Sequence, residues 1–182
     1  MEKTVEKTFQ VEGIYTIRAI EFNPDLERDI ELAIVANDRS AYMDLIKSAT
    51  IRTKKIKNLI TLPARAMIAG RIAGDNLIYT GVINYLALGT STTAADEDDT
   101  ELVAEVYRKR KNIYSSDNNV ATLDWYFTKA NVDGTFQEIG TFIDGEETAD
   151  SGLLFSRIIT GGWPKTSNEG MAVTVQYTII NS

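Results

Sequence analysis

Apolar and polar residues alternate in four stretches of the second half of the chain, and this alternation constrains the fold more than any other feature of the sequence. The stretches are residues 121–127, 136–143, 153–160 and 171–180. The apolar positions of the first stretch are Ala121, Leu123, Trp125 and Phe127. A period of two residues is typical of a strand with one apolar and one polar face. The pattern therefore predicts four such strands.

Turn signals separate these strands and favour an antiparallel arrangement. Residues 131–134 suit a short hairpin, because the glycine at its end accepts a positive φ. Residues 161–164 and 167–170 interrupt the chain between the later strands. Strands with short connections pack readily as antiparallel sheets. We expect a mainly β fold with short helices (α+β), whose body is an antiparallel β-sandwich or a jelly-roll-like structure.

Two short helices are predicted in the middle of the chain. The first spans residues 62–73, since Thr61 can cap its start, Pro63 fits its first turn and Gly74 suits a left-handed cap at its end. The second spans residues 99–110, where Asp98 can cap the helix and Glu101 can complete a capping box. An apolar face formed by Leu102, Val103, Val106 and Tyr107 supports this second helix.

The first third of the chain follows a different pattern. Residues 9–22 are rich in β-branched and aromatic side chains, which predicts one or two strands. Residues 26–36 fit either a helix or a buried strand. We expect residues 1–56 to form a strand-containing extension or attachment arm, and residues 57–182 to form the β-rich body.

The chain contains no cysteine and no histidine, which excludes several kinds of chemistry. It has no disulfide, no thiolate nucleophile, no Ser–His–Asp triad and no histidine-ligated zinc. With 43% hydrophobic and 25% charged residues, the 182-residue chain has the composition of a globular domain. We expect no enzyme, no catalytic residue and no cofactor.

The acidic residues provide only weak candidates for a site. Residues 96–99 lack the spacing of a calcium loop, so we expect no metal site. Glu138 with Asp144, or Glu146 with Glu147, could be the carboxylate pair of a glycoside hydrolase, but acidic chains commonly contain such pairs. The Gly-rich residues 70–74 lack the lysine of a phosphate loop and are better placed at a helix end.

The net charge of −7 disfavours binding to nucleic acid or to an anionic membrane, and we expect neither partner. No apolar run is long enough for a signal peptide or a membrane span. Two basic runs, at residues 52–57 and 108–111, lie against this negative background. They are either solvated faces with ordinary salt bridges, which we favour, or contacts between copies in an assembly.

The stretch 83–108 combines an apolar strand, a Gly-Thr turn and an acidic loop, and it resembles a module of tailed-bacteriophage virion proteins. The residues that match the module there are Gly89, Thr90, Thr92, Asp99, Thr100, Leu102, Glu101, Glu105 and Arg108. The downstream matches are the Asp-Gly-Thr-x-x-Glu-x-Gly motif at 133–140, the Leu-Phe-Ser-Arg strand at 154–157 and the turn at 165–167. With the lead-in at 57–73, the resemblance covers residues 57–182.

This resemblance implies a non-enzymatic structural component of a tailed-phage virion. Such a protein would be synthesised in the host cytoplasm and located in the virion, as an accessory piece of the tail, baseplate or capsid. Its partners would be other virion proteins and further copies of itself in a homo-oligomer. The alternative function is a receptor- or carbohydrate-binding module at a tail tip, which would bind a host-surface glycan.

Six residues are candidate partner contacts: Tyr15, Ile17, Arg52, Lys54, Lys55 and Trp163. The first two belong to the unmatched N-terminal strand, and the next three to a basic run. Trp163 lies in a Gly-rich loop, where it either plugs the end of the sandwich, which we favour, or anchors a partner. Trp125 and Tyr126 must face opposite sides of a strand, so one can be core while the other is displayed.

Overall fold

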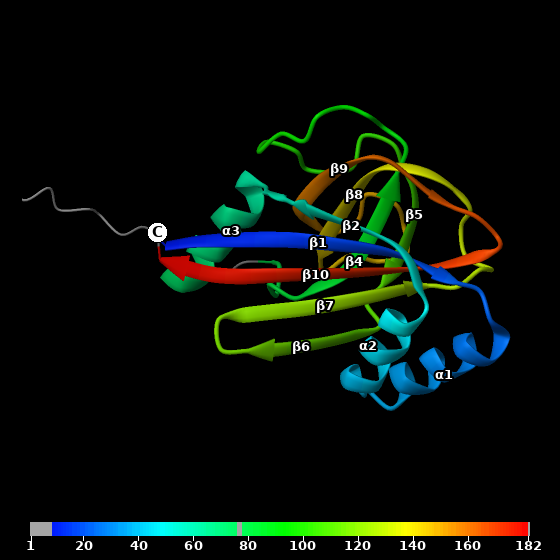
Figure 1. Cartoon of the computed structure of the whole chain (residues 1–182). Helices are drawn as coiled ribbons and strands as arrows, with labels where there is room; N and C mark the ends of the chain where they lie inside the picture. Colours follow the sequence, from blue (N-terminus) through cyan, green and yellow to red (C-terminus); the bar gives the residue numbers. More distant parts are fainter. Residues whose placement is uncertain (1–8, 76–77, 182) are drawn as a thin grey trace, which may run out of the picture.

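The computed structural model describes residues 9–75 and 78–181, which form two antiparallel sheets of five strands each. Sheet A has the order β2-β1-β10-β7-β6 and sheet B the order β3-β9-β8-β4-β5. Figure 1 shows the two sheets and the helices beside them. The elements are β1 (Phe9–Glu21), α1 (Pro24–Val35), α2 (Arg39–Ser48), β2 (Thr50–Lys57), β3 (Leu59–Ile60), α3 (Leu62–Ala73), β4 (Ile83–Gly89), β5 (Glu105–Arg110), β6 (Ile113–Asp117), β7 (Val120–Phe127), β8 (Gly134–Ile143), β9 (Leu153–Lys165) and β10 (Glu169–Asn181). The expected mainly β fold with short helices is confirmed.

The core lies between the two sheets, and the alternating stretches supply much of it. Trp125 and Phe127 from β7 meet Ile139 from β8 and Val173 from β10 in one buried cluster. The alternation predicts these strands correctly, but it does not predict which sheet each one joins. The expected hairpin at 131–134 is wrong, because β7 belongs to sheet A and β8 to sheet B. The turn carries the chain from one sheet to the other.

Helices α1 and α2 cover the outer face of sheet A at one end. Ile30, Tyr42 and Ile46 from these helices pack on Tyr126 and Ala172 of the sheet. Residues 26–36 therefore lie largely in a helix, and Asn23 caps it by accepting from the backbone of Asp25. The expectation that either Trp125 or Tyr126 can be displayed is not met, since Trp125 is 0% exposed and the helices leave only 4% of Tyr126 exposed.

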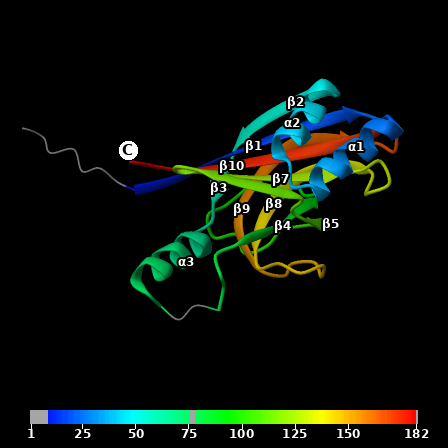
Figure 2. The ribbon, with the colours of Figure 1, turned by 90° about the horizontal axis from the view of Figure 1, so that it is seen from below.

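Helix α3 lies at the opposite end of the molecule from α1 and α2, as Figure 1 and Figure 2 both show. Its predicted bounds and both of its predicted caps are confirmed. The Thr61 hydroxyl accepts from the Ala64 amide, and Gly74 ends the helix in the left-handed conformation at φ +82°. Pro63 lies in the first turn, where an amide hydrogen is not needed.

The predicted helix at 99–110 is wrong. Residues 99–104 form turns and loop, and Glu105–Arg110 is strand β5, paired with β4. The Val103 and Ala104 amides donate to the side chain of Glu138, far away in the sequence. A tertiary contact therefore takes the hydrogen bonds that a helix would need.

The N-terminal third is part of the sandwich, which corrects the expectation of a separate extension before residue 57. Strand β1 pairs with β10 along its whole length, from Phe9 opposite Asn181 to Glu21 opposite Glu169. On its other side it pairs with β2, from Ile14 to Ile20. Strands β1 and β2 thus supply two of the five strands of sheet A.

Candidate functional site

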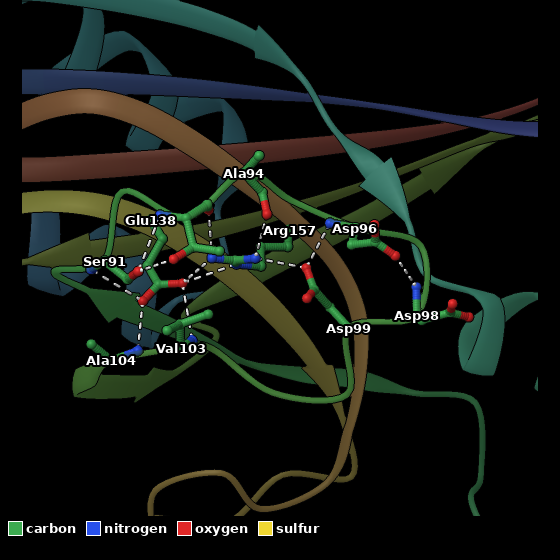
Figure 3. Close-up of polar contacts among 10 residues, drawn as sticks. Ser91, Ala94, Asp96, Asp98, Asp99, Val103, Ala104, Glu138 and Arg157 are labelled. Carbon is green, nitrogen blue, oxygen red and sulfur yellow. Dashed lines mark hydrogen bonds and ion pairs between the residues drawn. The ribbon is translucent and has the colours of Figure 1, made fainter.

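A buried ion pair between Arg157 of β9 and Glu138 of β8 holds the acidic loop on the outer face of sheet B (Figure 3). Neither side chain has exposed surface. Two nitrogens of Arg157, Nε and Nη2, contact Oε2 of Glu138 at 2.9 and 2.7 Å. The remaining contacts of both residues lead into the segment that joins β4 to β5.

The loop donates to Glu138 and accepts from Arg157. The Ser91 and Ala104 amides donate to Oε1 of Glu138, and the Val103 amide donates to Oε2. Arg157 donates to the carbonyls of Thr93 and Ala94 and to Asp99, whose Oδ2 lies 2.7 Å from Nη1. Each carboxylate oxygen of Glu138 thus accepts at least two hydrogen bonds. A carboxylate saturated in this way is suited to holding a loop, and it has no free position from which to act as a general acid or base.

Small and apolar residues complete this cluster. A Cβ on Gly89 would overlap the carboxylate of Glu138, and one on Gly140 would lie 2.8 Å from Leu154 and 2.9 Å from Leu102. Leu102 packs with Leu154 and Phe142 in a satellite core under the loop. Residues from the motifs at 83–108, 133–140 and 154–157 therefore meet in space at this cluster. What they share is a structural role in fixing the loop.

Two of the acidic residues at 96–99, Asp96 and Asp99, make hydrogen bonds within the loop. Asp96 accepts from the amide of Asp98, and Asp99 accepts from the amide of Asp96 as well as from Arg157. Within residues 9–75 and 78–181, no group of three or more acidic side chains is arranged to hold a metal ion.

Two further polar networks are buried, one between the two sheets and one on the outer face of sheet A. Between the sheets, the hydroxyls of Tyr15 and Tyr177 share hydrogen bonds with Thr141 and Ser156, at 2.6 Å between Tyr177 and Thr141 and 2.8 Å between Tyr15 and Ser156. Burial raises the pKa of both tyrosine hydroxyls. On the outer face, the buried Asp124 carboxylate accepts from Arg39 at 2.8 Å and from Thr174 at 2.7 Å. The hydroxyls and the carboxylate of these networks bond to other groups of the protein.

The six candidate contact residues have different environments. Tyr15, Ile17 and Trp163 are at most 4% exposed and belong to the core, so they are not available to a partner. The favoured interpretation of Trp163 as a buried plug fits this position, and the guanidinium carbon of Arg52 lies 4.6 Å from the centre of its ring. Lys54 donates to the carbonyl of Thr160. Lys55 lies exposed on β2.

The second basic run is largely occupied by internal contacts. Arg108 pairs with Glu105 at 2.6 Å, and both side chains are almost completely buried. Lys109 donates to the Tyr126 carbonyl and Lys111 to the Ile83 carbonyl, and burial lowers the pKa of both amines. These residues brace the corner at which the chain passes from β5 in sheet B to β6 in sheet A.

Two grooves flank α3 at its end of the sandwich. The α3–β1 groove, of about 510 Å³, runs between the start of β1 and α3, and its apolar lining includes Val11, Ile60, Ile68 and Ile72. The α3–β6 groove, of about 560 Å³, opens on the other side, where Val82, Tyr114 and Ile179 contribute to its lining. Apolar side chains are exposed here: Ile72 at 76%, Ile78 at 88%, Val82 at 51%, Tyr114 at 61% and Ile179 at 47%.

Sequence reasoning does not single out this end of the molecule. One signal was present, because apolar residues occur all around the 62–73 helix instead of on one face only. Tyr114 and Ile179 come from strands far apart in the sequence, and only the fold brings them near α3. Single exposed apolar residues are ordinary, whereas a group around two grooves is typical of an interaction surface.

Fold and site together define an antiparallel β-sandwich with an apolar, grooved end. No protein-family model, curated protein or solved structure matches the chain. No helix of the described residues is long and apolar enough to cross a membrane.

Proposed function

We propose that this protein is a non-enzymatic structural component of a tailed-phage virion, an accessory piece of the tail, baseplate or capsid. It would assemble in multiple copies and with other virion proteins. The observation that carries the proposal is the apolar end of the sandwich, where Ile72, Ile78 and Tyr114 are mostly exposed. When a partner covers apolar side chains at one end of a domain, their removal from water stabilises the complex.

The buried cluster supports the same proposal. The residues shared with the virion module, including Glu138, Arg157 and Asp99, act on the loop and not on a substrate. A loop fixed by buried contacts is suited to a structural task, since the copies in an assembly must all present the same surface.

The alternative, a carbohydrate-binding module at a tail tip, required an exposed Trp163 or Tyr126 beside an acidic or amide side chain. Both rings are 4% exposed. Neither of these two aromatic residues can therefore serve as a platform for a sugar ring. The glycan-binding alternative is accordingly less favoured.

Labelling of purified particles tests the proposal. Antibodies raised against the chain are applied to tailed-phage particles released from cells that encode it, and the label is located by electron microscopy. We expect label at one fixed position on each particle. Absence of the chain from washed particles, measured by mass spectrometry, would overturn the proposal whatever the purified chain does in solution.

A further inference from the structure

Strand β1 forms an unpaired margin of sheet A at its beginning. Its pairing with β2 starts at Ile14, and the Asn58 amide makes the last bond on this side, to the carbonyl of Gly13. After Asn58 the chain enters sheet B, so the first residues of β1 extend beyond the end of β2, as Figure 1 shows. Backbone groups of alternate residues point to the same side of a strand. The amide and carbonyl of Val11 therefore point outward, toward the α3–β1 groove.

Strand β6 forms the opposite margin of the same sheet. Among residues 9–75 and 78–181 it pairs with β7 alone, and Figure 1 shows no strand beyond it. The Ile179 amide donates to the carbonyl of Asn119, just before β7. The backbone groups of odd-numbered residues in β7 therefore point toward β10, and those of even-numbered residues point toward β6. Asp124 and Thr122 lie opposite Ile113 and Ser115 in that ladder. The backbone groups of Tyr114 and Ser116 are left pointing outward.

The two margins have compatible directions. Strands β1, β10, β7 and β6 are each antiparallel to the next, so β6 runs opposite to β1. A second copy placed beside the first in the same orientation brings its β6 antiparallel to β1. Antiparallel pairing then continues sheet A from one copy to the next without inverting either copy.

The side chains at these margins are complementary as well. Tyr114 lies opposite Leu123 and so shares the inner face of sheet A with it, although 61% of Tyr114 is exposed. Val11 packs on the same inner face, at the wall of the α3–β1 groove. When β6 of a second copy extends the sheet, its Tyr114 side chain faces the apolar wall made by Ile68 and Ile72 of α3.

The rest of the β2–β1 margin is protected. Strand β2 carries Arg52, Lys54, Lys55 and Lys57 in eight residues. Lysines on an edge strand oppose pairing with another edge, because their charges and long side chains cannot be buried. The segment of β1 ahead of Gly13 carries no lysine among its described residues 9–12.

We propose that copies of this chain join head to tail, the β6 edge of one copy pairing with the β1 edge of the next beside α3. This inference rests on the proposed function and names the surface by which copies assemble. The interface is heterologous, so its repetition builds a closed ring or a helical row, not a two-fold dimer.

Proline substitutions at the outward-facing amides test the pairing. Val11→Pro and Ser116→Pro each remove one margin N–H without touching a bond inside sheet A, and edge strands accept proline at such positions. Val11→Ala and Ser116→Ala are the matched controls, since they change the side chain and keep the amide. Self-association of the full chain and of each variant is measured by sedimentation velocity over a range of concentrations, and circular dichroism checks the fold.

We expect the full chain and the alanine variants to assemble as concentration rises. Each proline variant should self-associate with an affinity lower by roughly tenfold or more, because it lacks one hydrogen bond of the interface. A heterologous interface also predicts the result of mixing. Val11→Pro keeps an intact β6 edge and Ser116→Pro an intact β1 edge, so the mixture should form a complex with one copy of each and stop there.

Three results would overturn the inference. They are folded proline variants that assemble like the full chain, a mixture of the two that stays apart, and a full chain that remains monomeric throughout. The last leaves the virion proposal to the particle labelling described above. If the proline variants do not fold, Tyr114→Lys replaces them, since this side chain is already mostly exposed. Unchanged assembly of Tyr114→Lys also overturns the inference.

Discussion

At the scale of single residues, burial of charge distinguishes this protein. Arg157 and Glu138 lie side by side with no exposed surface, and Arg108 and Glu105 are nearly as buried. Desolvation of such a pair costs several kcal/mol for each ion, which attraction and surrounding hydrogen bonds must offset. Here both Arg157 and Glu138 also bond to the backbone of the loop. The pair is therefore tied to the position of the loop, and disrupting it should affect the whole face of sheet B.

Replacement of Arg157 by methionine should destabilise the protein by about 3–5 kcal/mol, because Glu138 keeps a buried charge without its partner. Urea unfolding followed by circular dichroism measures the change. The matched control is Arg65→Met on the surface pair with Glu97, where we expect less than about 1 kcal/mol. Equal effects for both arginines would contradict the assignment of Arg157 as the anchor of the loop.

The buried tyrosines make the free energy of unfolding decrease at alkaline pH. Burial raises the pKa of Tyr15, Tyr42, Tyr126 and Tyr177 above the unfolded value near 10. The folded state therefore holds protons that the unfolded state releases, so stability is fully present below pH 10 and is lost as pH rises above it. We expect the melting temperature to fall steeply above that pH.

Absorbance titration checks the same tyrosines directly. The four buried hydroxyls, whose pKa burial raises, should ionise together with unfolding. Tyr177→Phe provides a variant with one fewer buried hydroxyl, which should reduce the step that coincides with unfolding. A single smooth titration of all tyrosines in the folded protein would contradict their burial.

At the scale of elements, the loop between β4 and β5 depends on one apolar anchor as well as on the ion pair. Leu102 is 2% exposed and packs with Leu154 and Phe142, while its neighbour Val103 is 54% exposed. Leu102→Ala should cost about 2–5 kcal/mol, because it leaves a cavity under the loop. Val103→Ala should cost less than about 0.5 kcal/mol.

Limited proteolysis shows whether that cost falls on the loop. Leu102→Ala should be cleaved within residues 90–104 faster than the unsubstituted chain, since local opening of the loop becomes easier. Cleavage elsewhere first, with the loop still protected, would mean that the ion pair alone holds it.

The helices show how far local sequence signals reach. Helix α3 lies where the sequence predicts it, because Thr61, Pro63 and Gly74 act on the backbone next to them. The helix expected at 99–110 has equally good local signals, yet Glu138 and Arg157 draw the loop onto sheet B. Interaction with residues distant in the sequence overrides a local preference, and a single sequence does not reveal such an interaction.

At the scale of the whole molecule, the chain joins its two sheets at both sides. At the sheet edges it crosses from sheet A to sheet B at Asn58, after β2, and from sheet B to sheet A at Lys111 and Asn112, after β5. It crosses again between β7 and β8 and between β9 and β10. The alternating pattern predicts strands and their apolar faces, but residues on either sheet show the same alternation. For this reason the pairing of β1 with β10, and with it the place of the grooves beside α3, could not be predicted from the pattern.

A chain that begins at Lys57 should not fold, although the module resemblance starts there. It lacks β1 and β2, so one whole side of β10 loses its ladder and Val173, Val175 and Tyr177 lose the side chains of Tyr15 and Ile17 that share their core. It also lacks α1 and α2, which leaves Tyr126 and Ala172 uncovered. Losses on both faces of sheet A exceed the roughly 5–15 kcal/mol by which a domain is stable.

Circular dichroism and thermal unfolding measure this outcome, with the full chain under the same conditions as the control. We expect the shortened chain to show no cooperative transition and to aggregate through the exposed edge of β10. Adding the missing part as a separate polypeptide of residues 1–56 should restore a cooperative transition if the two parts are one sandwich. A shortened chain that melts cooperatively on its own would instead mean that residues 57–182 are an independent body, and that residues 1–56 are attached to it.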